Sequence, residues 1–275
     1  GRILRGEKTA GIDLGVVLGH EISGFVVEVG HGVAGFSEGD LVSVMPTVPC
    51  LACYYCKAGA EHLCTRSTLF GYALDGGLAD YVRIPAQAME RGGVFRAESN
   101  VSAVEAALAE PLGCVLNGAA NYQPDAGDTV VVIGAGPIGL LHTQVNRLYG
   151  ASQVIVSDPA GERRALAEKL GATHTVDPTA QDLGEFVRGL TDGRGADVAV
   201  TEGVMGLYDG GRGGIGSSAQ IAKILRLPVV LVIDVRSMGE SAAAAALGFR
   251  EYDREVDLRG VILNRLGSES HLETI

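Results

Sequence analysis

With 275 residues, the chain is long enough for two domains with sizeable cores. Its net charge of −11 argues against nucleic acid or an anionic membrane as a partner, because both carry negative charge themselves. We find no apolar run long enough to span a membrane and no signal-peptide pattern. Four of the five cysteines lie within fifteen residues, which favours a metal site in a reducing compartment over a disulfide framework, and we therefore expect a cytoplasmic protein.

The predicted elements fall into two patterns along the chain. Residues 16–90 contain short β-rich segments separated by glycine, which predicts a small barrel or sandwich, and a helical stretch follows at 102–119. From residue 129 strands and helices alternate, as in proteins with a parallel sheet. The strands are expected near 129–133, 153–157, 196–200, 228–234 and 260–264, with later helices near 217–226 and 238–249.

The stretch PCLACYYCKAGAEHLC has the spacing C-x2-C-x2-C-x7-C. It contains Cys50, Cys53, Cys56 and Cys64. Two-residue gaps let successive thiolates turn onto one cation, and four thiolates complete a tetrahedral zinc site with no open position. An iron–sulfur cluster and four unrelated buried cysteines are the alternatives. The spacing favours a structural zinc.

A glycine-rich loop, VVVIGAGPIG, stands directly after a predicted strand and before a predicted helix. Such a loop lets the backbone approach a pyrophosphate, and the helix N-terminus directs N–H groups towards it. The expected cofactor-binding residues are Gly134, Gly136, Pro137, Ile138 and Gly139.

Asp158 follows the next predicted strand, where a carboxylate can accept hydrogen bonds from the adenosine ribose. This position favours NAD over NADP, because a 2′-phosphate would meet a negative charge. Arg163 and Arg164 lie nearby and weaken that preference.

A second glycine pattern, at residues 211–216, is also close to a P-loop, but Ser217 stands where the phosphate-binding lysine belongs. We interpret it as a turn before a helix that Ser217 or Ser218 caps.

Residues 1–200 resemble the zinc-dependent medium-chain alcohol dehydrogenases. The resemblance rests on GHE at 19–21, GD-x-V at 39–42, the four cysteines, DGGLADYV at 75–82, AEPL at 109–112 and VVIGAGPIGLL. Glutamate in E-P-L, at Glu110, points to the polyol and sorbitol dehydrogenase branch. The resemblance implies oxidation of a secondary alcohol to a ketone, with hydride transfer to NAD.

The same resemblance assigns His20 and Glu110 to a catalytic zinc, with Glu21 as an alternate ligand or a residue beside the metal. The family's first ligand lies in a C-G-x-D stretch that in this numbering precedes Gly1. Cys114 is the remaining cysteine, and we do not assign it as a ligand. With two firm protein ligands we expect weak metal binding and impaired activity.

Residues 201–275 resemble part of the ATP-dependent synthetase domain of cobyrinic acid a,c-diamide synthases. The matching stretches are EGVMGLYDG, GSSAQIAKIL, LPVVLVIDVRSM and GVILNRLGSESH. Glu202 and Asp209 match acidic positions that handle Mg²⁺ or substrate in that family, and the alternative is that both are solvated loop carboxylates. That family's Walker lysine and glutaminase domain are missing from the sequence.

These observations predict an α/β protein: a GroES-like, zinc-binding catalytic domain (1–120), an NAD-binding Rossmann half (121–200) and a synthase-like segment (201–275). We expect the last segment to complete one doubly wound parallel sheet with P-loop NTPase-like strands. The primary hypothesis is a zinc-dependent, NAD-linked dehydrogenase for a small alcohol or polyol. The alternatives are an ATP-dependent amidating ligase fragment using ATP and Mg²⁺, and a non-catalytic chimera that binds zinc and NAD. The sequence leaves the oligomeric state open, with a homo-oligomer as one alternative.

Overall fold

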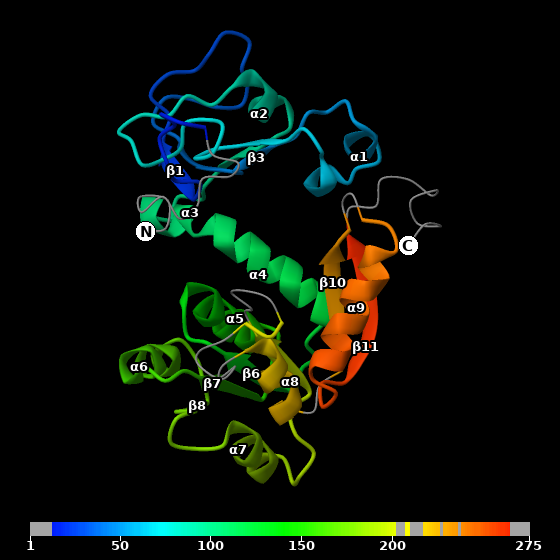
Figure 1. Cartoon of the computed structure of the whole chain (residues 1–275). Helices are drawn as coiled ribbons and strands as arrows, with labels where there is room; N and C mark the ends of the chain where they lie inside the picture. Colours follow the sequence, from blue (N-terminus) through cyan, green and yellow to red (C-terminus); the bar gives the residue numbers. More distant parts are fainter. Residues whose placement is uncertain (1–12, 202–206, 210–216, 226–227, 236–237, 265–275) are drawn as a thin grey trace. The chain divides into compact units, whose positions relative to one another are not determined.

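The computed structural model describes residues 13–201, 207–209, 217–225, 228–235 and 238–264. The chain divides into two compact units, residues 1–118 and 119–275. The helices and strands of both units carry the labels of Figure 1. None of the helices in the described part of the chain is both long and apolar enough to cross a membrane.

The first unit contains two small antiparallel sheets. One has the order β1-β2-β5 and the other pairs β3 with β4. Their bounds are β1 Ile22–Phe25, β2 Leu41–Val44, β3 Thr47–Val48, β4 Thr68–Leu69 and β5 Val94–Arg96. The core between them is formed by Ile22, Val44, Val48, Phe70 and Ala88. Within residues 13–118 these sheets do not close into the expected barrel, and LADYVRIP at 78–85 forms no strand.

Short helices connect these strands, and a longer one leads out of the unit. They are α1 Tyr54–Lys57, the 3₁₀ helix η1 Glu61–Leu63, α2 Ala86–Glu90, α3 Ala103–Ala107 and α4 Ala109–Tyr122. The single helix expected over 102–119 is therefore two helices. Ser102 and Glu105 form a reciprocal capping box that starts α3. Pro111 lies in the first turn of α4, where its missing N–H would have had no helical partner.

The second unit contains a four-stranded parallel sheet with the order β8-β7-β6-β9, which is the order of a Rossmann half. The strands are β6 Thr129–Ile133, β7 Gln153–Ser157, β8 His174–Val176 and β9 Val198–Thr201. Helices α5 Pro137–Leu148 and α6 Gly161–Lys169 pack on one face, and α7 Leu183–Leu190 packs on the other (Figure 1). Because both faces are covered, the central strands are continuous buried runs of valine and isoleucine.

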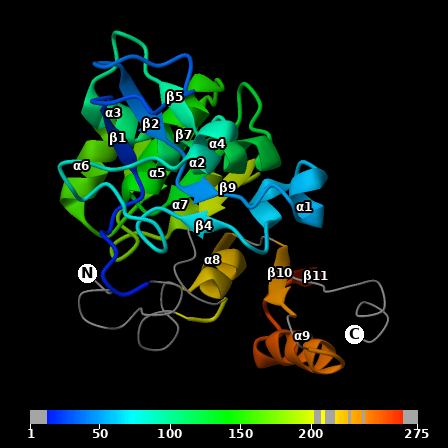
Figure 2. The same cartoon turned by 90° about the horizontal axis from the view of Figure 1, so that it is seen from above.

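The remaining elements are α8 Ser218–Leu225, β10 Val229–Asp234, α9 Ser241–Tyr252 and β11 Leu258–Asn264. They lie within a few residues of the predicted elements, and Ser217 caps α8 by accepting a hydrogen bond from the Gln220 N–H at 3.2 Å. Strands β10 and β11 pair in parallel, and α9 packs on one face of the pair (Figure 2).

The prediction that one hybrid sheet would contain all five parallel strands is wrong for the described residues. There, β10 pairs only with β11, and β9 pairs only with β6. Hydrophobic runs predict strands, but they do not specify which edges meet. The face of β10 and β11 away from α9 accordingly leaves Val230, Val232 and Ile262 more than half exposed.

Candidate metal centres and dinucleotide site

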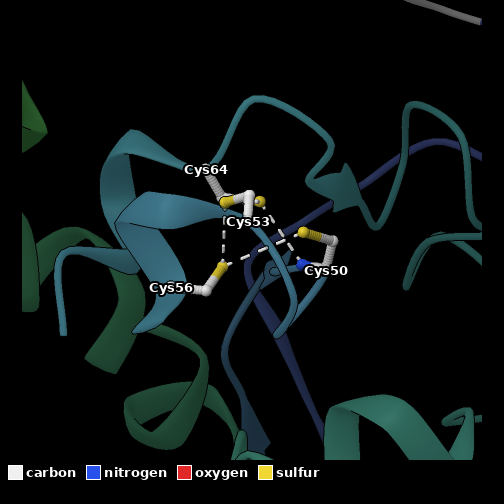
Figure 3. Close-up of side chains that lie close together, drawn as sticks. All are labelled: Cys50, Cys53, Cys56 and Cys64. Carbon is white, nitrogen blue, oxygen red and sulfur yellow. Dashed lines mark hydrogen bonds between the residues drawn. The ribbon is translucent and has the colours of Figure 1, made fainter. Parts of the chain in front are cut away.

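The four cysteines lie together in the lobe between β3 and β4 (Figure 3). Their ligand atoms all lie within 4.8 Å of one another, and the measured Sγ–Sγ distances are 3.5, 3.8 and 4.0 Å. A tetrahedron with zinc–sulfur bonds of about 2.3 Å has edges of about 3.8 Å. The residues present therefore fit a closed tetrahedral metal site.

The backbone of this lobe is arranged around the sulfur atoms. The Cys50 N–H donates a hydrogen bond to Cys64 Sγ at 3.3 Å, and Cys53 is the N-cap of α1. Leu51, between the first two cysteines, has a φ of 59°, a left-handed conformation that is uncommon for a residue with a branched side chain. The surrounding residues therefore hold Leu51 in this conformation, because it is not one that a leucine backbone prefers by itself.

The acidity of the thiols reflects this crowding. Backbone N–H groups, that of Ala52 above all, lower the pKa of Cys50 to about 6, and the N–H of Cys56 lowers the pKa of Cys53. Burial and the neighbouring sulfur atoms raise the pKa of Cys56 to about 12. The backbone N–H groups therefore favour the thiolates of Cys50 and Cys53, the form in which cysteine binds a metal ion, whereas the surroundings of Cys56 favour its thiol.

A second group of potential ligands consists of His20, Glu21 and Glu110. His20 and Glu21 precede β1, whereas Glu110 lies in the first turn of α4. The structure brings their ligand atoms within 4.8 Å of one another, with His20 and Glu110 half-buried and Glu21 exposed. One imidazole and two carboxylates leave a coordination position open, which is the arrangement of catalytic rather than structural zinc sites.

Glycines allow the chain to reach this arrangement. An ideal Cβ on Gly76 would lie 2.0 Å from the Gly19 carbonyl oxygen, and one on Gly71 would lie 2.9 Å from the Gly19 nitrogen. The Gly77 N–H also donates to the Gly19 carbonyl at 3.0 Å. The loop over residues 71–78 therefore packs directly against the backbone that precedes His20.

The glycine loop after β6 has the conformation that a phosphate-binding turn requires. Gly134 has a φ of 100°, and a Cβ on Gly139 would lie 1.9 Å from the Gly134 carbonyl oxygen. Gly136 is the N-cap of α5 and Pro137 is its first residue, with Ile138 next in the helix. The N-terminus of α5, with its free N–H groups, thus stands at the carboxyl edge of the sheet.

The carboxylate of Asp158 lies immediately after β7 and is buried. Its Oδ2 accepts a hydrogen bond from the Ala135 N–H at 2.9 Å, and its Oδ1 accepts one from the Ala160 N–H at 2.8 Å. Arg163 approaches it to 3.7 Å and is largely exposed, whereas Arg164 donates to the carbonyls of residues 158 and 159 and pairs with Asp177. Asp158 therefore joins the glycine loop to the end of β7.

A cavity of about 200 Å³ lies between α5 and the carboxyl ends of β6 and β9. Residues Ile133, Ile138, Gly139, His142 and Thr201 are among those that line it. Strands β6 and β9 are neighbours at the point where the strand order of the sheet reverses, and ligands of open α/β sheets bind at that point. We did not single out His142 from the sequence, since a lone histidine in an amphipathic helix gives no signal.

Of the alternative ligase residues, Glu202 lies outside the described residues and Asp209 is exposed. Nothing in the described residues adds an observation in favour of ATP or Mg²⁺ at this place, and the ligase interpretation stays a prediction.

Sequence reasoning also missed Tyr72, whose ring lies 5.9 Å from that of His20 between centroids.

Two family models match the chain in succession. The alcohol dehydrogenase GroES-like domain matches residues 2–91, and the zinc-binding dehydrogenase model matches residues 137–202. Residues 203–275 lie beyond both matches.

Named relatives agree with these models. The chain is 42% identical over 182 residues to an L-threonine 3-dehydrogenase of Pyrococcus furiosus, covering 66% of this chain and 51% of the relative. It is 38% identical over 190 residues to an erythritol/L-threitol dehydrogenase of Mycolicibacterium smegmatis, covering 67% of this chain and 51% of the relative. The chain thus spans about half the length of the curated relatives it matches.

Solved structures give the same result. A zinc-binding dehydrogenase from Sinorhizobium meliloti, bound to NADP, has a TM-score of 0.69 and 35% identity over 83% of this chain and 64% of its own. The galactitol-1-phosphate dehydrogenase of Escherichia coli has a TM-score of 0.68 and 25% identity, and the match covers 99% of this chain and 75% of its own. The family matches fall on the stretches that carry the four cysteines, His20 and most of the Rossmann half, and the chain belongs to the zinc-dependent medium-chain alcohol dehydrogenase family.

Proposed function

We propose that the chain is the metal-binding and cofactor-binding part of a zinc-dependent dehydrogenase that oxidises a small secondary alcohol with NAD or NADP. The observation that carries the proposal is the cluster of His20, Glu21 and Glu110, which has an open coordination position. It shares one unit with the closed four-cysteine cluster. A structural metal site and an open one together suit a zinc-dependent dehydrogenase.

The three segments of the chain have different roles in this proposal. Residues 1–120 hold the metals, residues 121–200 hold the dinucleotide, and residues 201–275 extend the α/β unit. A zinc ion bound at the open site would polarise the substrate hydroxyl and lower its pKa. His20 and Glu110 would hold that ion, with Glu21 as the third donor. No thiolate is among these donors, so we expect weaker zinc binding here than at the four cysteines.

The cofactor would be bound through the loop and the cavity beside α5. The backbone N–H groups at the α5 N-terminus face the pyrophosphate position, and Asp158 keeps the loop in place through Ala135. Asp158 favours NAD, whereas the exposed Arg163 is available to a 2′-phosphate. The named relatives suggest L-threonine and erythritol as the first substrates to test.

The test is formation of NADH or NADPH from each cofactor with these alcohols, in the presence of zinc. We expect slow, zinc-dependent reduction that Glu110→Gln abolishes, whereas Cys114→Ser leaves the rate unchanged. Reduction that is indifferent to zinc and to Glu110 would contradict the assignment. Cofactor binding without any reduction, at saturating zinc, would support the non-catalytic alternative.

A further inference from the structure

The side chain of His20 lies beside an aromatic neighbour. The rings of His20 and Tyr72 lie with their centroids 5.9 Å apart and their planes inclined by 56°. Both residues are half-buried in the first unit. Tyr72 lies in the turn after β4, far from His20 in the sequence, so the contact depends on the fold of this unit.

The turn that carries Tyr72 is fixed by its own backbone. The Gly71 N–H donates to the Leu74 carbonyl at 2.7 Å, and the Tyr72 N–H donates to the Leu69 carbonyl at 3.2 Å. Gly71 has a φ of 76°, which a residue with a side chain rarely adopts. The tyrosine ring therefore starts from a defined backbone position.

The same loop is also tied to the segment that carries His20. The N–H groups of Gly76, Gly77 and Leu78 donate to the carbonyls of residues 17, 19 and 18 at distances of 2.8 to 3.0 Å. Asp75 accepts a further hydrogen bond from the Val17 N–H at 3.0 Å. The loop and the His20 segment thus form one hydrogen-bonded unit, and the two rings meet within it.

A histidine that binds a metal usually donates its other ring N–H to a carboxylate or a carbonyl, which fixes the ring. Among the described residues, the structure gives His20 the contact with Tyr72 and no such acceptor. We propose that Tyr72 is a positioning residue: its ring holds the His20 imidazole in the orientation in which it binds a metal ion together with Glu21 and Glu110. This inference rests on the metal site of the proposed function.

The test is a titration of the metal-free chain with Co²⁺, which reports on both clusters separately. Cobalt at the four cysteines gives intense thiolate charge-transfer bands in the near ultraviolet together with visible bands of its own. Cobalt bound by imidazole and carboxylate adds weaker visible bands without thiolate charge transfer, and these are measured as the increase after the thiolate bands have saturated. The variants are Tyr72→Leu, which removes the ring but keeps an apolar side chain, and Tyr72→Phe, which keeps the ring. Tyr81→Leu, an exposed tyrosine nearby in the sequence, is the matched control.

We expect Tyr72→Leu to weaken cobalt binding at the His20 cluster by about tenfold, the lower end of the effect of removing a group that orients a ligand. Tyr72→Phe and Tyr81→Leu should retain the wild-type affinity and visible spectrum, and the thiolate bands should be the same in all variants. An unchanged visible spectrum and affinity in Tyr72→Leu would overturn the inference alone. A wild-type chain that takes up cobalt only at the cysteines would overturn the proposed function and this inference with it.

Loss of the thiolate bands in Tyr72→Leu would mean that this variant has not folded. The contact is then tested in the metal-free wild-type chain by nuclear Overhauser effects between the ring protons of His20 and Tyr72. Their observation, together with wild-type cobalt binding by Tyr72→Phe, supports the inference. Their absence in a folded chain overturns it.

Discussion

The carbonyl oxygen of Gly19 occupies the place where a side chain on Gly76 would begin, since an ideal Cβ there would lie 2.0 Å from it. Both partners are backbone, so neither can move aside as a flexible side chain would. The close approach places the loop over residues 71–78 against His20. The geometry of the open metal cluster therefore depends on a residue that has no ligand atom of its own.

Replacement of Gly76 by alanine should separate the loop from Gly19 and disturb the metal cluster. We expect a loss of about 1–3 kcal/mol in the free energy of unfolding, the usual range for an overpacked site. Zinc binding that depends on His20 should weaken in parallel. Denaturant unfolding and zinc titration measure the two effects.

Gly24→Ala is the matched control for this substitution, because the space around its Cβ position is open. It lies in β1 of the same unit. If Gly76→Ala behaved like Gly24→Ala in both measurements, the close approach would not matter for the cluster.

Replacement of Asp158 by asparagine should loosen the glycine loop. The carboxylate accepts from the N–H groups of Ala135 and Ala160, one at each oxygen. The asparagine side chain has the same shape, but its NH₂ group replaces one of the two accepting oxygens. That NH₂ group would then face a backbone N–H, which is also a donor. We expect a loss of about 1–3 kcal/mol in stability, as for a buried group left without its partner.

The affinity for NAD should fall together with the stability in Asp158→Asn. Titration with the cofactor, followed by fluorescence, measures this affinity. Arg164→Met serves as the comparison, because it removes the pair with Asp177 and the hydrogen bonds to the carbonyls of residues 158 and 159 but keeps both N–H donors to the Asp158 carboxylate. An NAD affinity that falls as much in Arg164→Met as in Asp158→Asn would mean that the loop end as a whole, and not the bond to Ala135, determines cofactor binding.

The stability of the second unit should depend on pH through His142. Burial lowers the pKa of this imidazole, which lies 3.1 Å from the Tyr122 hydroxyl through its Nδ1. The unfolded chain, with an ordinary histidine pKa of about 6.5, binds a proton that the folded chain resists. The free energy of unfolding should therefore fall as the pH decreases below about 6.5 and level off once the folded histidine is protonated too.

This prediction is checked by denaturant unfolding at about pH 5 and about pH 8, the range over which histidine titrates. His142→Gln should remove part of the difference between the two values, whereas replacement of the exposed His62 by glutamine should leave it in place. A wild-type difference that survives unchanged in His142→Gln would assign the pH dependence to other groups.

Removal of metal should destabilise the four-cysteine lobe. Its local elements, α1 and η1, have no fully buried residues, so little apolar packing holds them together. We expect a chelator, or Cys53→Ser, to lower the thermal unfolding temperature and to expose the lobe to proteolysis. Cys114→Ser, which alters an exposed cysteine outside the lobe, should do neither. Equal resistance of Cys53→Ser and wild type to the protease would exclude a structural metal there.

Much of the second unit could be predicted because its signals are local. The valine-rich runs become buried parallel strands, Gly134 has a left-handed φ, and Gly139 lies where a Cβ would collide with the Gly134 carbonyl. Helix α7 was missed, although Asp182 caps it and Leu183, Phe186 and Val187 repeat at helical spacing. The cap and the helical spacing are therefore sufficient signals for this helix.

Other features depend on contacts between distant segments and were beyond the sequence. The ring of Tyr72 meets His20 only because the loop after β4 folds back on residues 17–19. The sequence also does not show that, among the described residues, β10 pairs only with β11. The composition of a strand predicts that it is a strand, but it does not specify which strand edge it meets. In the candidate site, the ligand types were evident from the motifs, whereas the residues that orient them were not.

The central claim, that this chain has one closed and one open metal site, is tested most directly by counting zinc per chain. We expect two zinc ions per chain at saturating zinc, and one zinc ion per chain in Glu110→Ala and in Cys53→Ser. A wild-type chain with a single zinc that Glu110→Ala does not remove would contradict it.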